Sequence, residues 1–114
     1  MDDLLSQLPL REPTFFMLLS LSPGPRHGYA ILKEVESLSE GRLKLSTGTL
    51  YGGIRRLLDL GWIRRVEDPI PNDTDRERKS YDLTDLGRRV LNAEIARLQK
   101  LVAVAEMQAA GQTS

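Results

Sequence analysis

The chain has 114 residues, enough for one domain with a single modest core. Hydrophobic residues make up 40% of it and charged residues 28%, which is typical of a folded globular protein and argues against disorder. Lys and Arg total 16, as do Asp and Glu, so net charge gives no overall attraction to nucleic acid or to an anionic membrane. Any basic surface must therefore be local.

Two further features concern the compartment. Cysteine is absent, which excludes disulfides, thiolate metal sites and cysteine nucleophiles and fits a reducing compartment. The chain starts with the acidic sequence MDDLLSQ, which lacks the basic residues of a secretory signal, and the apolar run near 15–21 is too short to span a bilayer. We expect a cytoplasmic protein without a membrane partner.

Three helices are expected in the first half of the chain. Pro13 and the apolar run after it predict a buried helix over 11–21, which the Pro and Gly residues of 22–25 end without a further regular element. Apolar residues at helical spacing predict a second, amphipathic helix over 28–41. A third helix follows Ser46, whose hydroxyl suits an N-cap, and ends at Gly61.

The third predicted helix has two unlike faces. Leu50, Ile54, Leu57 and Leu58 gather on one side of a helical wheel and form a packing face. The other side is small or polar and carries Gly48, Thr49, Gly52, Arg55, Arg56 and Asp59. Gly52 and Gly53 weaken the helix by about 1 kcal/mol each relative to alanine, a cost that a close approach of DNA or of a neighbouring helix would justify.

A β-hairpin and a long helix follow. Residues 62–67 alternate as a half-buried strand with Trp62 in the core, 68–78 form a loop rich in Pro, Asn and Asp, and 79–83 form a second strand. Thr84 can cap a helix over 84–110, and the tail after it is expected to fray. An apolar seam with spacings of four, three, four and three, as in a coiled coil, consists of Leu91, Ile95, Leu98, Val102 and Ala105. A second line widens the seam and comprises Leu86, Val90, Leu101 and Val104.

This order of elements predicts a mainly α fold with a small β-hairpin, a winged helix-turn-helix plus a long C-terminal dimerisation helix. We expect residues 1–83 to form the DNA-binding domain and residues 84–110 to form the dimerisation helix. In helix-turn-helix proteins the second helix of the motif lies in the major groove with its first residues at the base edges. Between residues 42 and 65 the chain has six basic residues and one acid, Asp59, so a neutral chain carries a basic middle.

The candidate DNA contacts follow from this placement. The small first turn of the third helix permits close approach, and Arg55 and Arg56 can reach guanine or phosphate. In the wing, acids precede the basic cluster, so only its later part is expected to contact DNA. The candidate set is Tyr29, Lys44, Ser46, Thr47, Gly48, Thr49, Tyr51, Arg55, Arg56, Arg76, Arg78 and Lys79. Arg64 and Arg65 point to opposite faces of a strand, so at most one faces DNA, and for Tyr29 and Tyr51 a structural role is a second option.

Three segments, HGYAILKEVE, STGTLYGGIRRLLDLGWI and KSYDLTDLGRRVL, in this order and spacing, resemble the PadR family of bacterial transcriptional regulators over almost the whole chain. The resemblance implies a winged helix, a homodimer formed through the C-terminal helix with help from the N-terminal one, and repression at a palindromic operator. The single C-terminal helix matches the shorter subgroup. Gly52 departs from the family pattern, since members often have proline after the tyrosine. The resemblance carries over to His27, Gly28, Tyr29, Gly48, Thr49, Leu50, Tyr51, Tyr81, Leu83, Thr84 and Gly87.

Other functions are weighed against this one. An enzyme is disfavoured, because the chain has one histidine, no cysteine, no GxSxG and no P-loop, and no cofactor or metal is expected. A winged helix that serves as a protein-interaction adaptor stays open, since the fold does not dictate DNA binding. So does a small apolar effector bound between subunits, although the long helix has no Trp or Tyr to stack on it. The expected dimer contacts are Leu91, Ile95, Leu98, Leu101, Val102 and Ala105.

Overall fold

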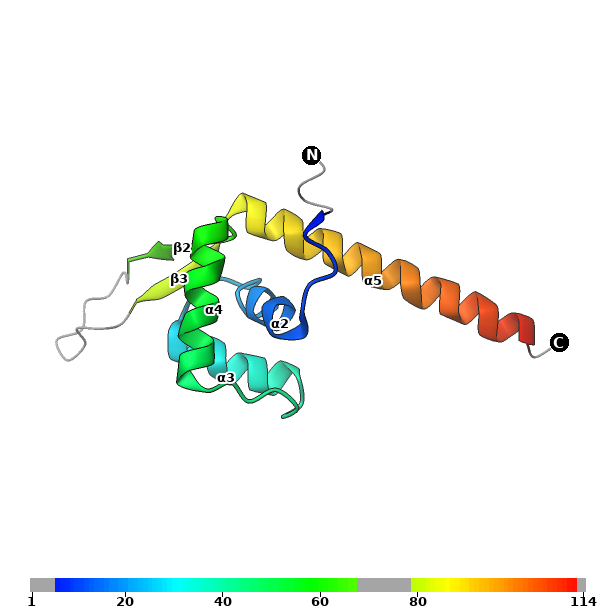
Figure 1. The fold of residues 1–114 in the computed structure, drawn as a ribbon, viewed down its shortest axis with the longest axis horizontal. Helices are drawn as coiled ribbons and strands as arrows, with labels where there is room; N and C mark the ends of the chain where they lie inside the picture. Colours follow the sequence, from blue (N-terminus) through cyan, green and yellow to red (C-terminus); the bar gives the residue numbers. More distant parts are fainter. Residues whose placement is uncertain (1–5, 68–78, 113–114) are drawn as a thin grey trace.

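The computed structural model describes residues 6–67 and 79–112. Three short helices pack together with a small sheet, and a long helix leaves this body and projects to one side (Figure 1). This arrangement confirms the predicted winged helix-turn-helix with a long C-terminal helix. In chain order the elements are α2 (Glu12–Ser20), β1 (Arg26–His27), α3 (Gly28–Leu38), α4 (Thr47–Leu60), β2 (Ile63–Val66), β3 (Ser80–Leu83) and α5 (Asp85–Gln112).

One core joins α2, α3, α4, β2, β3 and the first part of α5. Most of the predicted apolar faces are buried, and Trp62 lies in the core as predicted, whereas Tyr29 and the outer seam of α5 are exposed. Ile63 is buried next to Trp62, although strand alternation placed the two on opposite faces. The predicted packing face of the third helix is buried at Leu50, Ile54 and Leu57, while Arg55, Arg56 and Asp59 are exposed. The buried apolar residues are Met17, Leu18, Leu21, Ile31, Val35, Leu50, Ile54, Leu57, Trp62, Ile63, Tyr81, Leu83, Val90 and Leu91.

Helix α4 has the predicted caps, and the structure accounts for one of its two adjacent glycines, Gly52 and Gly53. Ser46 accepts a hydrogen bond from the backbone N–H of Thr49 at 3.1 Å, and Gly61 takes the left-handed conformation with φ of 77°. A Cβ at Gly53 would lie 3.0 Å from the Met17 sulfur, so this glycine lets α4 pack closely on α2. A Cβ at Gly52 would meet nothing within 4 Å, which leaves an open edge on the free face of α4.

The sheet has three strands rather than the predicted two. β2 and β3 pair antiparallel from Ile63 opposite Leu83 to Val66 opposite Ser80, which confirms the hairpin, while the expected loop over 68–78 lies outside the described residues. The expectation that no regular element follows the Pro and Gly residues of 22–25 was wrong, because Arg26 and His27 pair with Tyr81 and Ser80 as β1. A strand of two residues has no alternation to detect, and only its tertiary partner forms it.

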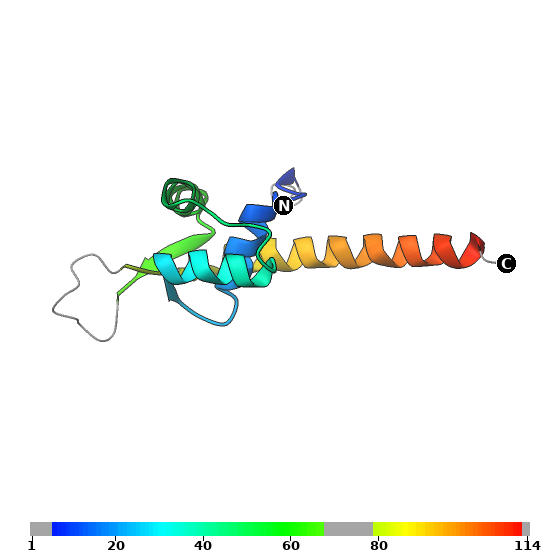
Figure 2. The ribbon, with the colours of Figure 1, turned by 90° about the horizontal axis from the view of Figure 1, so that it is seen from below.

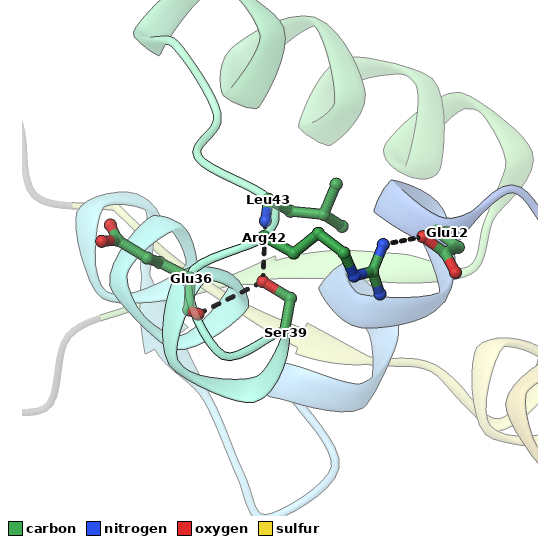
Figure 3. A network of polar contacts seen from close by, with 5 residues as sticks. All are labelled: Glu12, Glu36, Ser39, Arg42 and Leu43. Carbon is green, nitrogen blue, oxygen red and sulfur yellow. Dashed lines mark hydrogen bonds and ion pairs between the residues drawn. The ribbon is translucent and has the colours of Figure 1, made fainter.

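The turn between α3 and α4 is held by a buried serine. The Ser39 hydroxyl donates to the carbonyl of Glu36 at 3.2 Å and accepts from the N–H of Leu43 at 2.9 Å (Figure 3). Arg42 also pairs with Glu12 at the start of α2, but both side chains are more than half exposed, so this ion pair contributes little. Ser39 therefore does most to fix the segment that leads into α4.

The base of α5 is joined to the end of α4 by contacts at Thr84 and Gly87. The N–H of Thr84 donates to the carbonyl of Trp62 at 3.0 Å, and its hydroxyl donates to the carbonyl of Gly61 at 2.6 Å. The same hydroxyl accepts from the N–H of Gly87 at 3.0 Å, which confirms Thr84 as the helix cap. A Cβ at Gly87 would lie 1.9 Å from the Trp62 carbonyl oxygen, so only glycine allows this contact.

A buried carboxylate attaches α5 to the segment before α2. Glu94 is 2% exposed and accepts from the N–H of Leu10 at 3.1 Å and from the Arg97 guanidinium at 2.7 and 2.9 Å. The hydrogen bond from Arg97 lowers the pKa of Glu94 below its ordinary value, with help from the bond from Leu10, and outweighs desolvation, which raises it. Glu94 thus attaches α5 to the body at a second point, about two turns beyond the base of the helix.

The outer part of α5 projects away from the described body of the chain. Every residue from 99 to 111 is exposed, and the helix extends beyond the body in both views (Figures 1 and 2). The expectation of fraying from residue 111 was wrong, since α5 stays helical to Gln112. No helix within the described residues combines the length and the apolarity needed to cross a bilayer.

Gly87→Ala should destabilise the protein by about 2–4 kcal/mol, because the added methyl collides with backbone rather than with a flexible side chain. Urea denaturation measures the loss. Gly111→Ala, in the same helix, is the matched control, since a Cβ there would meet nothing within 4 Å. Its effect on the free energy of unfolding should stay below about 0.5 kcal/mol. Equal stability of the two variants would contradict the assigned contact.

Glu94→Gln should remove a pH-dependent part of the stability. Because folding lowers the pKa of Glu94, its ionised form stabilises the fold in full above the ordinary pKa of 4.5, and this contribution is lost as the pH falls through the lowered pKa. Wild type should exceed the variant by about 1–2 kcal/mol at pH 7 and converge with it at acid pH. Urea denaturation between pH 7 and pH 3 measures this. Glu106→Gln, on the exposed end of α5, is the control. A stability difference between wild type and Glu94→Gln that does not change with pH would refute the role assigned to the ionised carboxylate.

Candidate nucleic-acid interface

A groove of about 780 Å³ lies between α3, α4 and the sheet and concentrates positive charge. Five Lys and Arg side chains line it, against one carboxylate among its described lining residues, Glu34, which lies 3.8 Å from Arg26. This basic groove thus supplies the local positive surface that a neutral chain needs in order to bind a polyanion. Its lining residues are Arg26, His27, Gly28, Tyr29, Ala30, Lys33, Glu34, Tyr51, Ile54, Arg55, Leu58, Arg65, Lys79 and Tyr81.

Two tyrosines flank the mouth of the basic groove. Tyr29 is 65% exposed at the start of α3, and the Lys33 ammonium lies 5.8 Å from its ring centre, within the range of a cation–π contact. Tyr51 packs over the start of α3, where a Cβ at Gly28 would lie 2.7 Å from its hydroxyl. Tyr51 therefore has the structural role that the sequence left open, and it also lines the groove.

The first turn of α4 is exposed beside the groove. Ser46, Thr47, Gly48 and Thr49 are all exposed, and neither Gly48 nor Gly52 has anything within 4 Å of a Cβ position. The Ser46 hydroxyl is occupied by the cap and also donates to the Thr49 hydroxyl at 3.0 Å. Thr47, Gly48 and the open position at Gly52 therefore form the part of α4 that another molecule can approach most closely.

The arginines of α4 and β2 separate into two pairs. Arg55 and Arg65 line the basic groove, whereas Arg56 is exposed outside it. Arg64 lies opposite Asp82 in the sheet register and pairs with its carboxylate at 3.7 Å. Of the two strand arginines, Arg65 is the one that reaches the groove, which resolves the choice left open by strand alternation.

The remaining candidates are placed as follows. Lys79 lines the groove, and Lys44 is exposed in the loop before α4 but does not line it. Arg76 and Arg78 lie outside the described residues. The candidate set left out two cations of the groove, Arg26 and Lys33, and Arg65 was considered only as an alternative to Arg64. Lys33 was detectable, since it follows Tyr29 by four residues and so shares its helix face, whereas Arg26 reaches the groove through the unforeseen strand β1.

An apolar hollow of about 350 Å³ lies between α2 and α5. Phe15 of α2 faces Ile95, Leu98 and Val102, three of the predicted dimer contacts. Leu91 is 2% exposed and packs in the core of its own chain, whereas Val102 is 56% exposed and Leu101 and Ala105 are exposed as well. The predicted seam therefore starts inside the subunit and becomes free surface farther along α5. No group of three potential metal ligands occurs within residues 6–67 and 79–112.

The family model described as the transcriptional regulator PadR-like family matches residues 17–93, more than half of the chain. The chain belongs to the PadR-like family of transcriptional regulators. Members of this family are regulators rather than enzymes, in agreement with the sequence analysis. An uncharacterized 37.1 kDa protein in transposon TN4556 of Streptomyces fradiae is 33% identical over 90 residues, which cover 79% of this chain and 24% of that protein. The chain thus spans about a quarter of the length of this curated relative.

Solved structures of PadR regulators share this fold. A PadR family transcription regulator from Clostridium difficile R20291 superposes with a TM-score of 0.69 at 20% identity, over 85% of this chain and 97% of that one. PadR of Bacillus subtilis, solved in complex with operator DNA, superposes with a TM-score of 0.65 at 26% identity, over 76% of this chain and 48% of that one.

Replacing Gly28 should show whether it seats Tyr51. Gly28→Ala should destabilise the wild type by about 1 kcal/mol, because the methyl meets the Tyr51 ring and hydroxyl. In a Tyr51→Ala background the same change should stabilise by about 0.5–1 kcal/mol, since alanine is the better helix former. Thermal denaturation of the four proteins gives this double-mutant cycle. The same sign in both backgrounds would rule the contact out.

Proposed function

We propose that the protein is a sequence-specific DNA-binding repressor that acts in the cytoplasm as a homodimer on a palindromic operator. The observation that carries the proposal is the basic groove next to the exposed first turn of α4. Repression and the palindrome follow from the family resemblance and from the two-fold symmetry that a dimer would impose on its site. Residues 1–83 serve as the DNA-binding part and 84–110 as the dimerisation helix.

In this proposal α4 enters the major groove with its first turn at the base edges. Thr47, Gly48 and the open position at Gly52 permit close approach, because a Cβ at either glycine would meet nothing within 4 Å. The cations of the basic groove, including Arg55, Arg65 and Lys79, neutralise backbone phosphates. Arg56 and Tyr51 then contact bases or phosphates beside them.

The homodimer is supported by the unpartnered apolar face of α5. Large apolar side chains stay exposed along its outer part, where the described residues of the same chain leave them uncovered. A second copy of α5 would cover this face and supply the second α4 for the other half-site. The exposed large apolar residues of this part are Leu101, Val102, Val104 and Met107.

Two further functions were open after the sequence analysis. An adaptor is disfavoured, because the free face of α4 is small and basic rather than apolar. A small apolar effector has one specific observation in its favour. The apolar hollow contains Phe15, so α2 supplies the aromatic ring that α5 lacks, and Gln99 and Glu106 are its only polar lining residues within the described chain. We therefore include release by such an effector in the proposal.

Selection of bound DNA from a random pool tests the function directly. We expect enrichment of a palindrome with half-sites about one helical turn, roughly 34–36 Å, apart. Recovery of DNA without a shared sequence would contradict sequence-specific binding. Retention of an unrelated protein instead of DNA would favour the adaptor.

Arg65→Ala should weaken binding to the selected operator about tenfold and lower the salt dependence of log K by about one unit, because it removes a phosphate contact. Fluorescence anisotropy at several salt concentrations measures both quantities. Arg64→Ala is the matched control, since it removes the same charge from the adjacent residue but from an arginine paired with Asp82. Equal effects of the two variants would show that the groove does not hold DNA.

Val102→Glu should dissociate the dimer, because it places a charge in the apolar seam that a second α5 would cover. Sedimentation equilibrium measures the change as a rise in the dimer dissociation constant of at least about 100-fold, or roughly 3 kcal/mol. Ala96→Glu adds the same charge to the same helix on its exposed polar side and should leave the dimer intact. A monomeric wild type would overturn the assignment of the seam.

A further inference from the structure

Besides the core packing of Val90 and Leu91, polar and main-chain contacts attach helix α5 to the body at two separate places. Its base is held by Thr84 and Gly87 against the carbonyl groups that end α4. Farther along, Glu94 receives hydrogen bonds from the backbone of Leu10 and from Arg97. We call the group formed by Leu10, Glu94 and Arg97 the clasp.

The clasp is more than a surface ion pair. The Glu94 carboxylate is 2% exposed, and three hydrogen bonds, donated by two residues to its two oxygens, fix its position. One donor is a backbone N–H in the segment before α2, 84 residues away in the chain. Leu10 and Phe15 also pack on the core, so the clasp connects α5 to the body rather than to a loose tail.

The position of the clasp gives it leverage over the direction of α5. Glu94 lies nine residues after Asp85, or about 14 Å along the helix. A hydrogen bond stretched by about 1 Å is largely lost, so the intact clasp limits a swing of α5 about its base to roughly 4°. A swing of about 10° would move the start of α4, about 20 Å from the same base, by about 3.5 Å relative to α5. This displacement equals the rise of one base pair.

We propose that Glu94 is a positioning residue that sets the distance between the two recognition helices of the dimer, and with it the half-site spacing that the protein accepts. The proposal rests on the proposed DNA-binding dimer. With the clasp closed, the two copies of α4 stay at one separation. With the clasp open, each body swings about its own α5. The affinities for operators whose half-site spacings differ by one base pair then become more similar.

The first test measures the separation in the absence of DNA. Because the chain has no cysteine, Thr47→Cys at the start of α4 introduces one site per subunit for a nitroxide label. Pulsed dipolar electron resonance should give a narrow distance distribution for the otherwise wild-type dimer. Glu94→Ala should widen it at least about twofold, whereas Asn92→Ala, an exposed neutral change on the same helix, should leave it unchanged.

The outcomes separate the proposal from the function on which it rests. If the wild type shows no measurable distance between two labels, the protein is monomeric, and this result overturns both the dimer and the positioning role. A dimer whose Glu94→Ala form is as narrow as wild type overturns the positioning role alone. Should Glu94→Ala unfold, Arg97→Met decides, because it removes the two bonds that hold the Glu94 carboxylate in position to accept from Leu10, and it should still widen the distribution. An unchanged width in that variant overturns the proposal.

The second test uses operators with one base pair added to or removed from the spacer. Wild type should prefer the selected spacing by at least about tenfold, and Glu94→Ala should reduce this preference to less than about threefold. Removal of a negative charge raises affinity for all DNA alike, so it does not account for a loss of preference. A residue that acted only on stability would leave the preference intact in the folded variant, and that result overturns the proposal.

Discussion

The close approach of Gly87 to the carbonyl of Trp62 determines how the two halves of the protein are joined. At this point the end of α4, the start of β2 and the base of α5 meet, and a Cβ on residue 87 would lie 1.9 Å from the carbonyl oxygen. Thr84 uses both its N–H and its hydroxyl on the same stretch of backbone. The helix proposed to contact DNA and the helix proposed to form the dimer are thus coupled through main-chain atoms, which adjust less than side chains do.

The location of the positive surface depends more on which cations are paired with carboxylates than on where the cations lie in the sequence. The basic middle of the chain has six Lys and Arg residues, yet Arg42 pairs with Glu12 and Arg64 with Asp82. The basic groove instead gains Arg26, Lys33 and Lys79, which lie outside that stretch. A neutral chain therefore presents one concave positive surface, because tertiary structure brings separate cations together and leaves several carboxylates beside other arginines.

Features that depend on neighbours in the sequence were predictable. The Ser46 and Thr84 caps, the turn at Gly61 and the buried face of α4 follow from interactions within one or two helical turns. Strand β1, the packing of Gly53 on Met17, the seat of Tyr51 on Gly28 and the bond from Leu10 to Glu94 were not predicted. Each depends on a partner distant in the chain, and no periodicity or propensity encodes such a partner.

The apolar seam of α5 shows the same limit in a single element. Its spacing of four and three residues runs without interruption from Leu91 to Ala105, but its surroundings change along the way. Leu91 packs inside the subunit, Ile95 and Leu98 border the hollow beside Phe15, and Val102 is exposed. Periodicity identifies an apolar face that must be covered, but it does not show whether the same chain or a second chain covers it. The body of the chain covers the first turns, and in the proposed dimer a second copy of the same helix covers the exposed remainder.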